Sequence, residues 1–266
     1  MALKGLKGLD FKVWDALRRL YLSDPLTHCY LMYDLIYELE RTDIWSVMDD
    51  EGVSSYLLVW RGMGGLGLHI WRYNRILPLK SVLSEAKGKI VLHLYSKEDL
   101  KALIPLIEDM GLRYEVKWFK DMVVESAHFK PLMERKAVRL NAKEHLVHFL
   151  RLKSVQGREL GEEEAMRLIE RWRYYGIFEG GELVAIACRY IALPEVWVIG
   201  DVYTHPAHRG KGFAKAVTSA ITRDALASGA SALLHVGRSN TPALRVYERL
   251  GYIALRERPW VLLHKK

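Results

Sequence analysis

The segment that decides the fold is Val202–Lys215, with the sequence VYTHPAHRGKGFAK. The run before it, 196–200 (VWVIG), is rich in β-branched and aromatic residues and predicts a strand. The residues at 214–221 repeat apolar side chains at helical spacing and predict a helix. The sequence therefore predicts a strand that passes through a glycine-containing loop into the start of a helix.

This loop has the composition of an anion-binding site. The first N–H groups of a helix have no partners within the helix, and the helix dipole adds partial positive charge at the same end. Gly210 and Gly212 allow the backbone to approach a phosphate closely. Three cations flank them, namely Arg209, Lys211 and Lys215. We therefore expect the loop to bind a pyrophosphate.

Two other nucleotide-binding motifs do not account for the loop. A Walker A motif requires Ser or Thr after Gly-Lys, but Lys211 is followed by Gly212. The pattern of a dinucleotide fingerprint occurs at Gly62–Gly67, but the residues after it, 68–71 (LHIW), predict a strand instead of the required helix. We interpret Gly62–Gly67 as the loop of a β-hairpin.

The loop resembles the coenzyme A pyrophosphate motif of the GNAT superfamily of N-acetyltransferases, Arg/Gln-x-x-Gly-x-Gly/Ala, through Arg209, Gly212 and Ala214. Downstream, Asn240–Tyr252 (NTPALRVYERLGY) resembles the Asn…Ala…Tyr-Glu-x-Leu-Gly-Phe helix of the same superfamily. The motif Thr-x-Pro-x-x-Arg-Gly-x-Gly, which begins at Thr204, is similar to that of the glycine-acyltransferase-like branch of the superfamily. The resemblance covers about the last half of the chain and implies a coenzyme A site there.

The first half of the chain repeats the order of the second half. A predicted strand at 89–95 and a helix that ends at 109–112 match a strand at 231–236 and a helix that ends at 249–252. The two halves agree in the order of their predicted elements and in the glycine that ends each helix, which is typical of an internal repeat. We therefore predict two copies of one fold in tandem.

The first copy lacks the residues that would bind coenzyme A. No basic glycine loop precedes Leu79, and Ile107 stands where the second half has Tyr247. We expect a degenerate GNAT-like domain at 1–130 and a catalytic GNAT domain at 131–266. The resemblance implies an α+β fold, with a mixed, mostly antiparallel sheet and helices on both faces.

Composition and charge restrict the partners. The chain has 266 residues, enough for one large domain or two ordinary ones, and its 50% hydrophobic content is typical of a globular protein. The net charge of +8 favours polyanionic partners, and coenzyme A is one. The basic residues are dispersed and do not form a recognition module, which disfavours nucleic acid as a partner.

The chain shows no sign of secretion or membrane insertion. Its first ten residues lack the apolar core and cleavage site of a signal peptide. The longest apolar stretch, 183–200, contains charged residues and a proline. Cys29 and Cys188 have no pairing pattern and are expected to be buried thiols in a reducing compartment. We therefore expect a cytoplasmic protein.

The resemblance implies a set of contacts to coenzyme A. The backbone of residues 202–204 would contact the acetyl carbonyl and the pantetheine, with one N–H stabilising the oxyanion. Residues 210–215 would hold the pyrophosphate, and Asn240 would either bind the pantetheine or cap its helix. The expected binding residues are Val202, Tyr203, Thr204, Arg209, Gly210, Lys211, Gly212, Phe213, Ala214, Lys215 and Asn240.

Three residues are candidates for proton transfer. By the resemblance, Tyr247 occupies the position of the tyrosine that protonates the departing thiolate, a role for which a phenol is suited. His235 lies five residues before Asn240, where ribosomal-protein N-terminal acetyltransferases place a glutamate base, and a histidine can act there directly or through water. Asp201, on the same strand face as Tyr203, is the alternative base.

These features predict an acetyl-CoA-dependent N-acetyltransferase in which a primary amine attacks the thioester directly. The acceptor is open between a small amine or amino acid and a protein amine, and acyl-chain preference and oligomeric state are open too. A non-catalytic coenzyme A-binding or interaction module of the same fold is the alternative. No metal site is predicted, because the paired histidines have no cysteine or carboxylate cluster beside them: His145 with His148, and His205 with His208.

Overall fold

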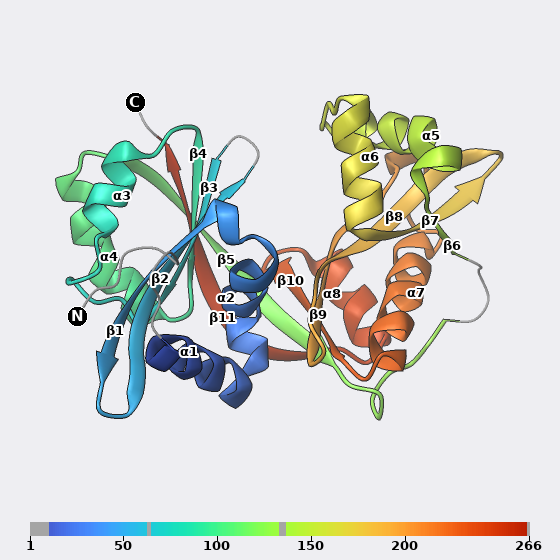
Figure 1. Cartoon of the computed structure of the whole chain (residues 1–266). Helices are drawn as coiled ribbons and strands as arrows, with labels where there is room; N and C mark the ends of the chain where they lie inside the picture. The colour runs from blue at the N-terminus through green and yellow to red at the C-terminus, as the bar shows by residue number, and fades with distance from the viewer. Residues whose placement is uncertain (1–10, 63–64, 133–136, 265–266) are drawn as a thin grey trace. The chain divides into compact units, whose positions relative to one another are not determined.

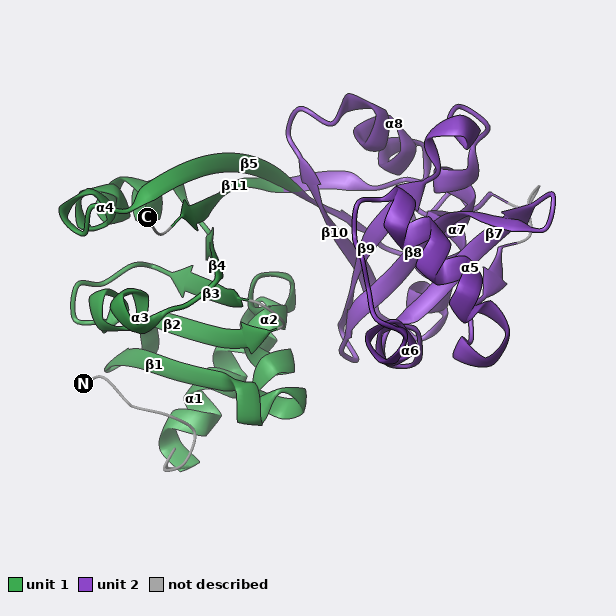
Figure 2. Cartoon of the chain, turned by 90° about the horizontal axis from the view of Figure 1, so that it is seen from above, with its two compact units in different colours: residues 1–120, 256–266 green, residues 121–255 purple. Residues whose placement is uncertain are grey.

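The structure, a computed structural model, describes residues 11–62, 65–132 and 137–264 (Figure 1). The chain divides into two compact units (Figure 2). Unit 1 comprises residues 1–120 and 256–266, and unit 2 comprises residues 121–255. The ranges expected from the sequence, 1–130 and 131–266, differ from these units in their boundary near residue 120 and in the last strand, whose residues from Arg256 onward belong to unit 1.

Unit 1 is a mixed sheet with helices on both faces (Figure 1). Alternate residues of a strand face opposite sides of a sheet. Leu57 and Val59 accordingly pack with α3 and α4, whereas Tyr56 and Leu58 pack with α1 and α2. The strand order is β1-β2-β3-β4-β11-β5. The elements are α1 (Phe11–Ser23), α2 (Pro25–Tyr37), the 3₁₀ turn η1 (Leu39–Arg41), β1 (Thr42–Asp49), β2 (Gly52–Gly62), β3 (Gly65–Trp71), α3 (Leu79–Glu85), β4 (Lys89–Leu94), α4 (Lys97–Asp109), β5 (Arg113–Val124) and β11 (Ile253–His264).

Unit 2 has the same layered construction. Ala185 and Ala187 pack with α7 and α8 on one face, and Ile186 and Cys188 pack with α5 and α6 on the other. The strand order is β5-β10-β9-β8-β7-β6. The elements are β6 (Val138–Arg139), α5 (Ala142–Val155), α6 (Glu162–Arg171), β7 (Arg173–Glu179), β8 (Glu182–Ala192), β9 (Val196–Thr204), the 3₁₀ turn η2 (Pro206–His208), α7 (Phe213–Ala227), β10 (Ser231–Gly237) and α8 (Thr241–Arg249).

The predicted α+β class is confirmed. The described strands form an 11-stranded sheet in which most neighbours are antiparallel, and β3–β4 and β9–β10 are parallel pairs. The expected hairpin at Gly62–Gly67 is also present, because β2 and β3 pair antiparallel as far as Gly62 and Gly65. Its tip, 63–64, lies outside the described residues. No helix of the described residues has the length and apolar character needed to span a membrane.

Two strands begin in one unit and end in the other. β5 leaves unit 1 after Lys120, and its last residues, 121–124, belong to unit 2. β11 leaves unit 2 after Leu255, and the remainder of the strand belongs to unit 1, where it pairs antiparallel with β4. The two halves of the chain therefore exchange strands: the end of β5 joins unit 2, and most of β11 joins unit 1.

Local start signals explain several helix boundaries. Asp24 accepts a hydrogen bond from the N–H of Thr27 at 3.0 Å and so caps α2, which has a proline at its start. Ser96 caps α4 in the same way through the N–H of Asp99, also at 3.0 Å. Both caps agree with the sequence, since capping depends on residues only three positions apart.

Candidate functional site

The sheet of unit 2 opens between its two parallel strands. β9 and β10 pair from Val196 opposite Ser231 to Ile199 opposite Leu234. Beyond this point β9 continues along β8, as far as Thr204, while β10 continues to Gly237. The strands therefore part at their carboxyl ends, and the backbone of β9 presents an edge on which an amide-containing chain can form hydrogen bonds.

A β-bulge on β9 lies at the opening. Tyr203 pairs with Ile186 and Gly200 pairs with Cys188, so three steps along β9 match two along β8. Asp201, within the bulge, has a φ of 50°. This left-handed conformation costs a non-glycine residue about 1–2 kcal/mol. Bulges redirect side chains and backbone groups, and they are frequent beside active sites.

The carboxylate of Asp201 contacts four side chains, one of which is the exposed Arg158, whose Nη1 lies 4.0 Å from Oδ1. It forms an ion pair with the ammonium group of Lys153, which is fully buried on α5. Gln156 donates to it at 3.1 Å and the hydroxyl of Tyr174 donates at 2.7 Å. Burial lowers the pKa of Lys153, and the Asp201 carboxylate acts in the opposite direction. Both oxygens of Asp201 are therefore engaged in contacts that fix the bulge.

The glycine loop leads from β9 into α7, as the sequence predicted. Gly212 immediately precedes the helix, with a φ of 81°, and Gly210 has a φ of 79°. A Cβ atom at either position would meet open space, so these sites need glycine for their left-handed backbone and not for lack of room. Gly212 provides no side chain to cap α7, which leaves the first N–H groups of the helix to a ligand or solvent.

The basic side chains around the loop differ in their partners. Arg209 is exposed, and its Nε donates to the carbonyl oxygen of Thr204 at 3.4 Å. Lys211 donates to the carboxylate of Glu179 at 3.2 Å, and His208 lies 2.8 Å from the same oxygen. The hydrogen bonds from His208 and Lys211 lower the pKa of Glu179. A phosphate at the loop would therefore compete with Glu179 for Lys211.

The remaining expected contact residues lie along the same path. Thr204 ends β9, and its hydroxyl oxygen is buried without a hydrogen-bond partner among the described residues. Phe213 is buried and anchors the start of α7 in the core, whereas Ala214 and Lys215 are half-buried. A buried hydroxyl without a hydrogen-bond partner beside the glycine loop would be satisfied by a ligand that supplies polar atoms.

Tyr247 lies on α8 within the core that α7 and α8 form against the sheet. Its ring centroid is 5.9 Å from that of Tyr252, and burial raises the pKa of Tyr247 to about 12. The phenol therefore stays protonated at neutral pH. Asn240 caps the same helix, accepting from the N–H of Ala243 at 3.3 Å, so of its two expected roles the structure shows the capping one.

His235 is paired with a residue that the sequence did not indicate. Its Nδ1 lies 2.6 Å from Oδ1 of Asp121, and the two side chains are only 4% and 1% exposed. Asp121 lies on β5, 114 positions earlier in the chain. A carboxylate within the otherwise apolar run 121–124 was the available signal, but nothing in the sequence connects it with His235.

His235 and Tyr247 belong to opposite faces of the sheet. Leu234 and Val236 pack in the core beneath α7 and α8, and Tyr247 belongs to that same core. Because side chains alternate along a strand, His235 faces the other side, toward which Asp201 also points. A group that passes through the opening between β9 and β10 would have Tyr247 on one side and His235 on the other.

The described strands of unit 1 do not part in this way. β3 and β4 remain paired as far as Ile70 opposite Leu94. His69 and His93 are partners in this register, and their rings stack at 4.4 Å between centroids. The carboxyl ends of β3 and β4 therefore stay paired, and the two histidine rings lie side by side on one face of these strands.

Comparison with known proteins agrees with this geometry. Residues 174–261 match the family model described as FR47-like protein. No curated protein sequence matches the chain. The X-ray structure of a Drosophila protein is similar, with a TM-score of 0.74 at 13% identity over 99% of this chain and 98% of that one.

Two further solved structures are also similar over the whole chain. An acetyltransferase from the GNAT family of Colwellia psychrerythraea has a TM-score of 0.58 at 15% identity, with 100% of both chains covered. A tandem GNAT protein from the clavulanic acid biosynthesis pathway has a TM-score of 0.57 at 12% identity, covering 99% of this chain and 98% of that one. The protein therefore has the GNAT acetyltransferase fold in a tandem arrangement, with an FR47-like domain in its C-terminal half.

The ion pair beneath the bulge yields a first prediction. Lys153→Met should lower the free energy of unfolding by about 3–5 kcal/mol, because it leaves the carboxylate of Asp201 without its buried counter-charge. Urea denaturation measures this. The same change at Lys143, exposed on the same helix, should cost less than about 0.5 kcal/mol. Equal stability of the two variants would show that the pair does not hold the bulge.

Proposed function

We propose that the protein is an N-acetyltransferase that uses acetyl-CoA to acetylate a primary amine. The observation that carries this proposal is the parting of β9 and β10 directly beside the glycine loop of α7. The opening gives a thioester a path through the sheet, and the loop gives its diphosphate a set of N–H donors. Acetyl-CoA is the substrate for which both features are suited.

The donor would lie along β9 and the start of α7. The first N–H groups of α7, with Arg209 and Lys215, would hold the pyrophosphate. The backbone of residues 202–204 would bind the pantetheine, with the orphaned hydroxyl of Thr204 beside it. One N–H from this segment would donate to the carbonyl oxygen as it becomes an oxyanion.

The reaction would then proceed from both faces of the sheet. The neutral amine attacks the carbonyl carbon, a C–N bond forms, and the nitrogen gives its extra proton to His235. As the tetrahedral intermediate collapses, the C–S bond breaks and Tyr247 protonates the departing sulfur. The burial that raises the pKa of Tyr247 also disfavours a thiolate in the same surroundings, so this proton transfer is not opposed by the environment.

The contacts of the two candidate bases favour His235. With Asp121 accepting from Nδ1, the other ring nitrogen of His235 has the lone pair that a base needs, and the carboxylate stabilises the imidazolium that forms. Asp201 instead uses its oxygens to bind Lys153, Gln156 and Tyr174. In our proposal, His235 is the base and Asp201 maintains the bulge.

The wider setting follows from two other features. Cys29 and Cys188 are buried and form no disulfide, which fits a reducing compartment such as the cytoplasm. A net charge of +8 suits the polyanionic donor. The acceptor would be a small amine, an amino acid or a protein amine, and a screen of amines with acetyl-CoA that detects free thiol would separate these.

Binding of the donor is the first test of the proposal. Coenzyme A should raise the unfolding temperature in a saturable way, because it binds only the folded protein. Arg209→Glu should abolish this shift by placing a negative charge beside the phosphates. Arg167→Glu, the same change at an exposed residue of α6, should leave it intact. A full shift in Arg209→Glu would exclude the loop as the binding site.

The acid is tested by removing one hydroxyl. Tyr247→Phe should lower kcat by about 10²-fold or more, with KM for acetyl-CoA nearly unchanged, because the phenol acts only as the sulfur departs. Tyr252→Phe is the matched control, since it removes a hydroxyl that only bonds to Thr222, at 2.6 Å, and should retain turnover. Similar kcat values for both variants would remove Tyr247 from the chemistry.

The pairing of His235 with Asp121 is tested by the pH profile of kcat/KM. Asp121→Asn should lower the plateau by about 10-fold or more and move the acid limb to lower pH, because an amide does not stabilise the imidazolium. Asp121→Glu should restore part of the rate. A lower plateau with an unmoved acid limb would indicate only a structural role. Coenzyme A binding without turnover on any amine would instead favour the non-catalytic module.

A further inference from the structure

Unit 1 contains a polar cavity that the proposed reaction does not use. It has a volume of about 530 Å³ and lies where β3 and β4 end, at Trp71–Arg72 and Tyr95–Ser96. The glycine loop of unit 2 follows β9, the strand with the corresponding place in its unit. The carboxyl ends of parallel strands are a frequent location for ligand sites in α/β proteins. No glycine occurs in the β3–α3 connection, 72–78, so a diphosphate is not its natural ligand.

The cavity is lined by charges of both signs. Arg72 and Arg256 line it with positive charge, and Asp49 and Glu51, at the turn between β1 and β2, line it with negative charge. One oxygen of Asp49 accepts hydrogen bonds from the N–H groups of Glu51 and Gly52, at 3.0 and 3.1 Å, so the other oxygen remains for a ligand. Asp24 and Asp99 also line it, but Asp24 caps α2, and Asp99 accepts hydrogen bonds from the hydroxyl of Ser96 at 2.8 Å and from the N–H of Tyr73 at 2.6 Å. The pocket therefore offers cationic groups and a separate pair of acidic groups.

Arg72 combines a left-handed backbone conformation with a guanidinium at the cavity. Its φ is 52°, in the left-handed region that glycine adopts without strain. Its guanidinium lies over the ring of Trp71, 4.5 Å from the centroid, and it makes no ion pair with any described residue. Strained residues persist where the surroundings or the function require them. Here the strain holds a guanidinium at the mouth of a cavity.

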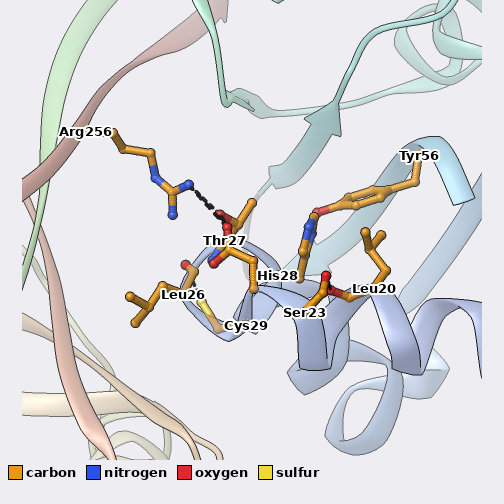
Figure 3. Close-up of polar contacts among 9 residues, drawn as sticks. Leu20, Ser23, Leu26, Thr27, His28, Cys29, Tyr56 and Arg256 are labelled. Atoms are coloured by element: carbon orange, nitrogen blue, oxygen red, sulfur yellow. Dashed lines mark hydrogen bonds and ion pairs between the residues drawn. The ribbon is translucent and has the colours of Figure 1, made fainter.

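A polar network at the start of α2 also lines the cavity. Figure 3 shows Arg256 reaching Thr27 at the start of α2, with His28 beside Tyr56. Nδ1 of His28 lies 3.0 Å from the hydroxyl of Tyr56, and burial lowers the pKa of His28 to about 4, so the ring is neutral at pH 7. Arg256 lies 4.0 Å from the carboxylate of Asp24, which positions it. The arginines are thus the cations of this cavity at neutral pH.

From this arrangement we infer that unit 1 binds a free α-amino acid. The carboxylate of the ligand would pair with Arg72 and Arg256, since a guanidinium recognises a carboxylate through two parallel hydrogen bonds. Its ammonium group would lie against Asp49 and Glu51. The apolar side of the cavity, formed by Leu20, Val53 and Trp71, would accept an aliphatic side chain. Both charges of the zwitterion are needed for binding.

The test is calorimetric titration of the full chain with alanine and leucine, and with acetate and ethylamine as half-ligands. The amino acids should bind, and each half-ligand should bind at least about tenfold more weakly. Arg72→Gln and Glu51→Gln should each weaken amino-acid binding by about tenfold or more. Arg75→Gln, the same change at a neighbouring exposed arginine outside the cavity, should have no effect.

Two further variants separate this site from misfolding and from the proposed transferase site. Arg72→Gly should lose binding while its unfolding midpoint is no lower than that of the parent, because glycine removes the backbone strain. Arg209→Glu should lose coenzyme A but keep amino-acid affinity, so the two proposals fail independently. The inference is overturned if no amino acid binds at about 10 mM, if acetate binds as tightly as alanine, or if Arg72→Gln and Glu51→Gln bind like the parent.

Discussion

The ion pair between Lys153 and Asp201 is the contact on which the opening of the unit 2 sheet depends. Asp201 holds a left-handed backbone conformation that costs about 1–2 kcal/mol. Removing one partner of a buried pair costs about 3–5 kcal/mol, because the other charge is left buried without a counter-charge. The bulge shifts the register of β9 against β8. This shift lies beyond Ile199, the last residue of β9 that pairs with β10.

The two units show how one topology can be open or closed. In unit 2, the parallel strands part beside a glycine loop. In unit 1, the parallel strands stay paired, and the stacked rings of His69 and His93 lie side by side on them. The connection from β3 to α3 has no glycine to admit a phosphate, and α3 is a short helix, Leu79–Glu85. The described residues of unit 1 thus lack the parted strands and the glycine loop of unit 2, and they line a polar cavity at the strand ends.

Each exchanged strand carries a charged residue to the unit that it joins. β5 brings Asp121 to His235 in unit 2. β11 brings Arg256 to the start of α2 in unit 1, where it lines the polar cavity. Arg256 lies outside the segment 1–120 that forms most of unit 1, and Asp121 is the first residue of the segment 121–255 that forms unit 2. A tandem repeat that exchanges strands can in this way give each half a side chain that its own sequence lacks.

The sequence by itself determined the features that depend on short separations along the chain. The strand, glycine loop and helix around 196–221, the caps at Asp24 and Ser96, and the hairpins follow from local backbone preferences and hydrogen bonds between near neighbours. The sequence also predicted the repeat of elements in the two halves and the α+β class. The roles of Tyr247 and His235 stay predictions, although the structure gives each of them definite surroundings.

Only the tertiary structure decided which distant groups meet. The partner of His235 is 114 positions away, the counter-charge of Asp201 lies 48 positions away on α5, and the final strand pairs with β4 of the first half. The sequence marked these residues as polar groups in apolar surroundings but not as partners. A buried charge needs a partner whatever its place in the chain, and packing of the whole sheet selects which one it finds.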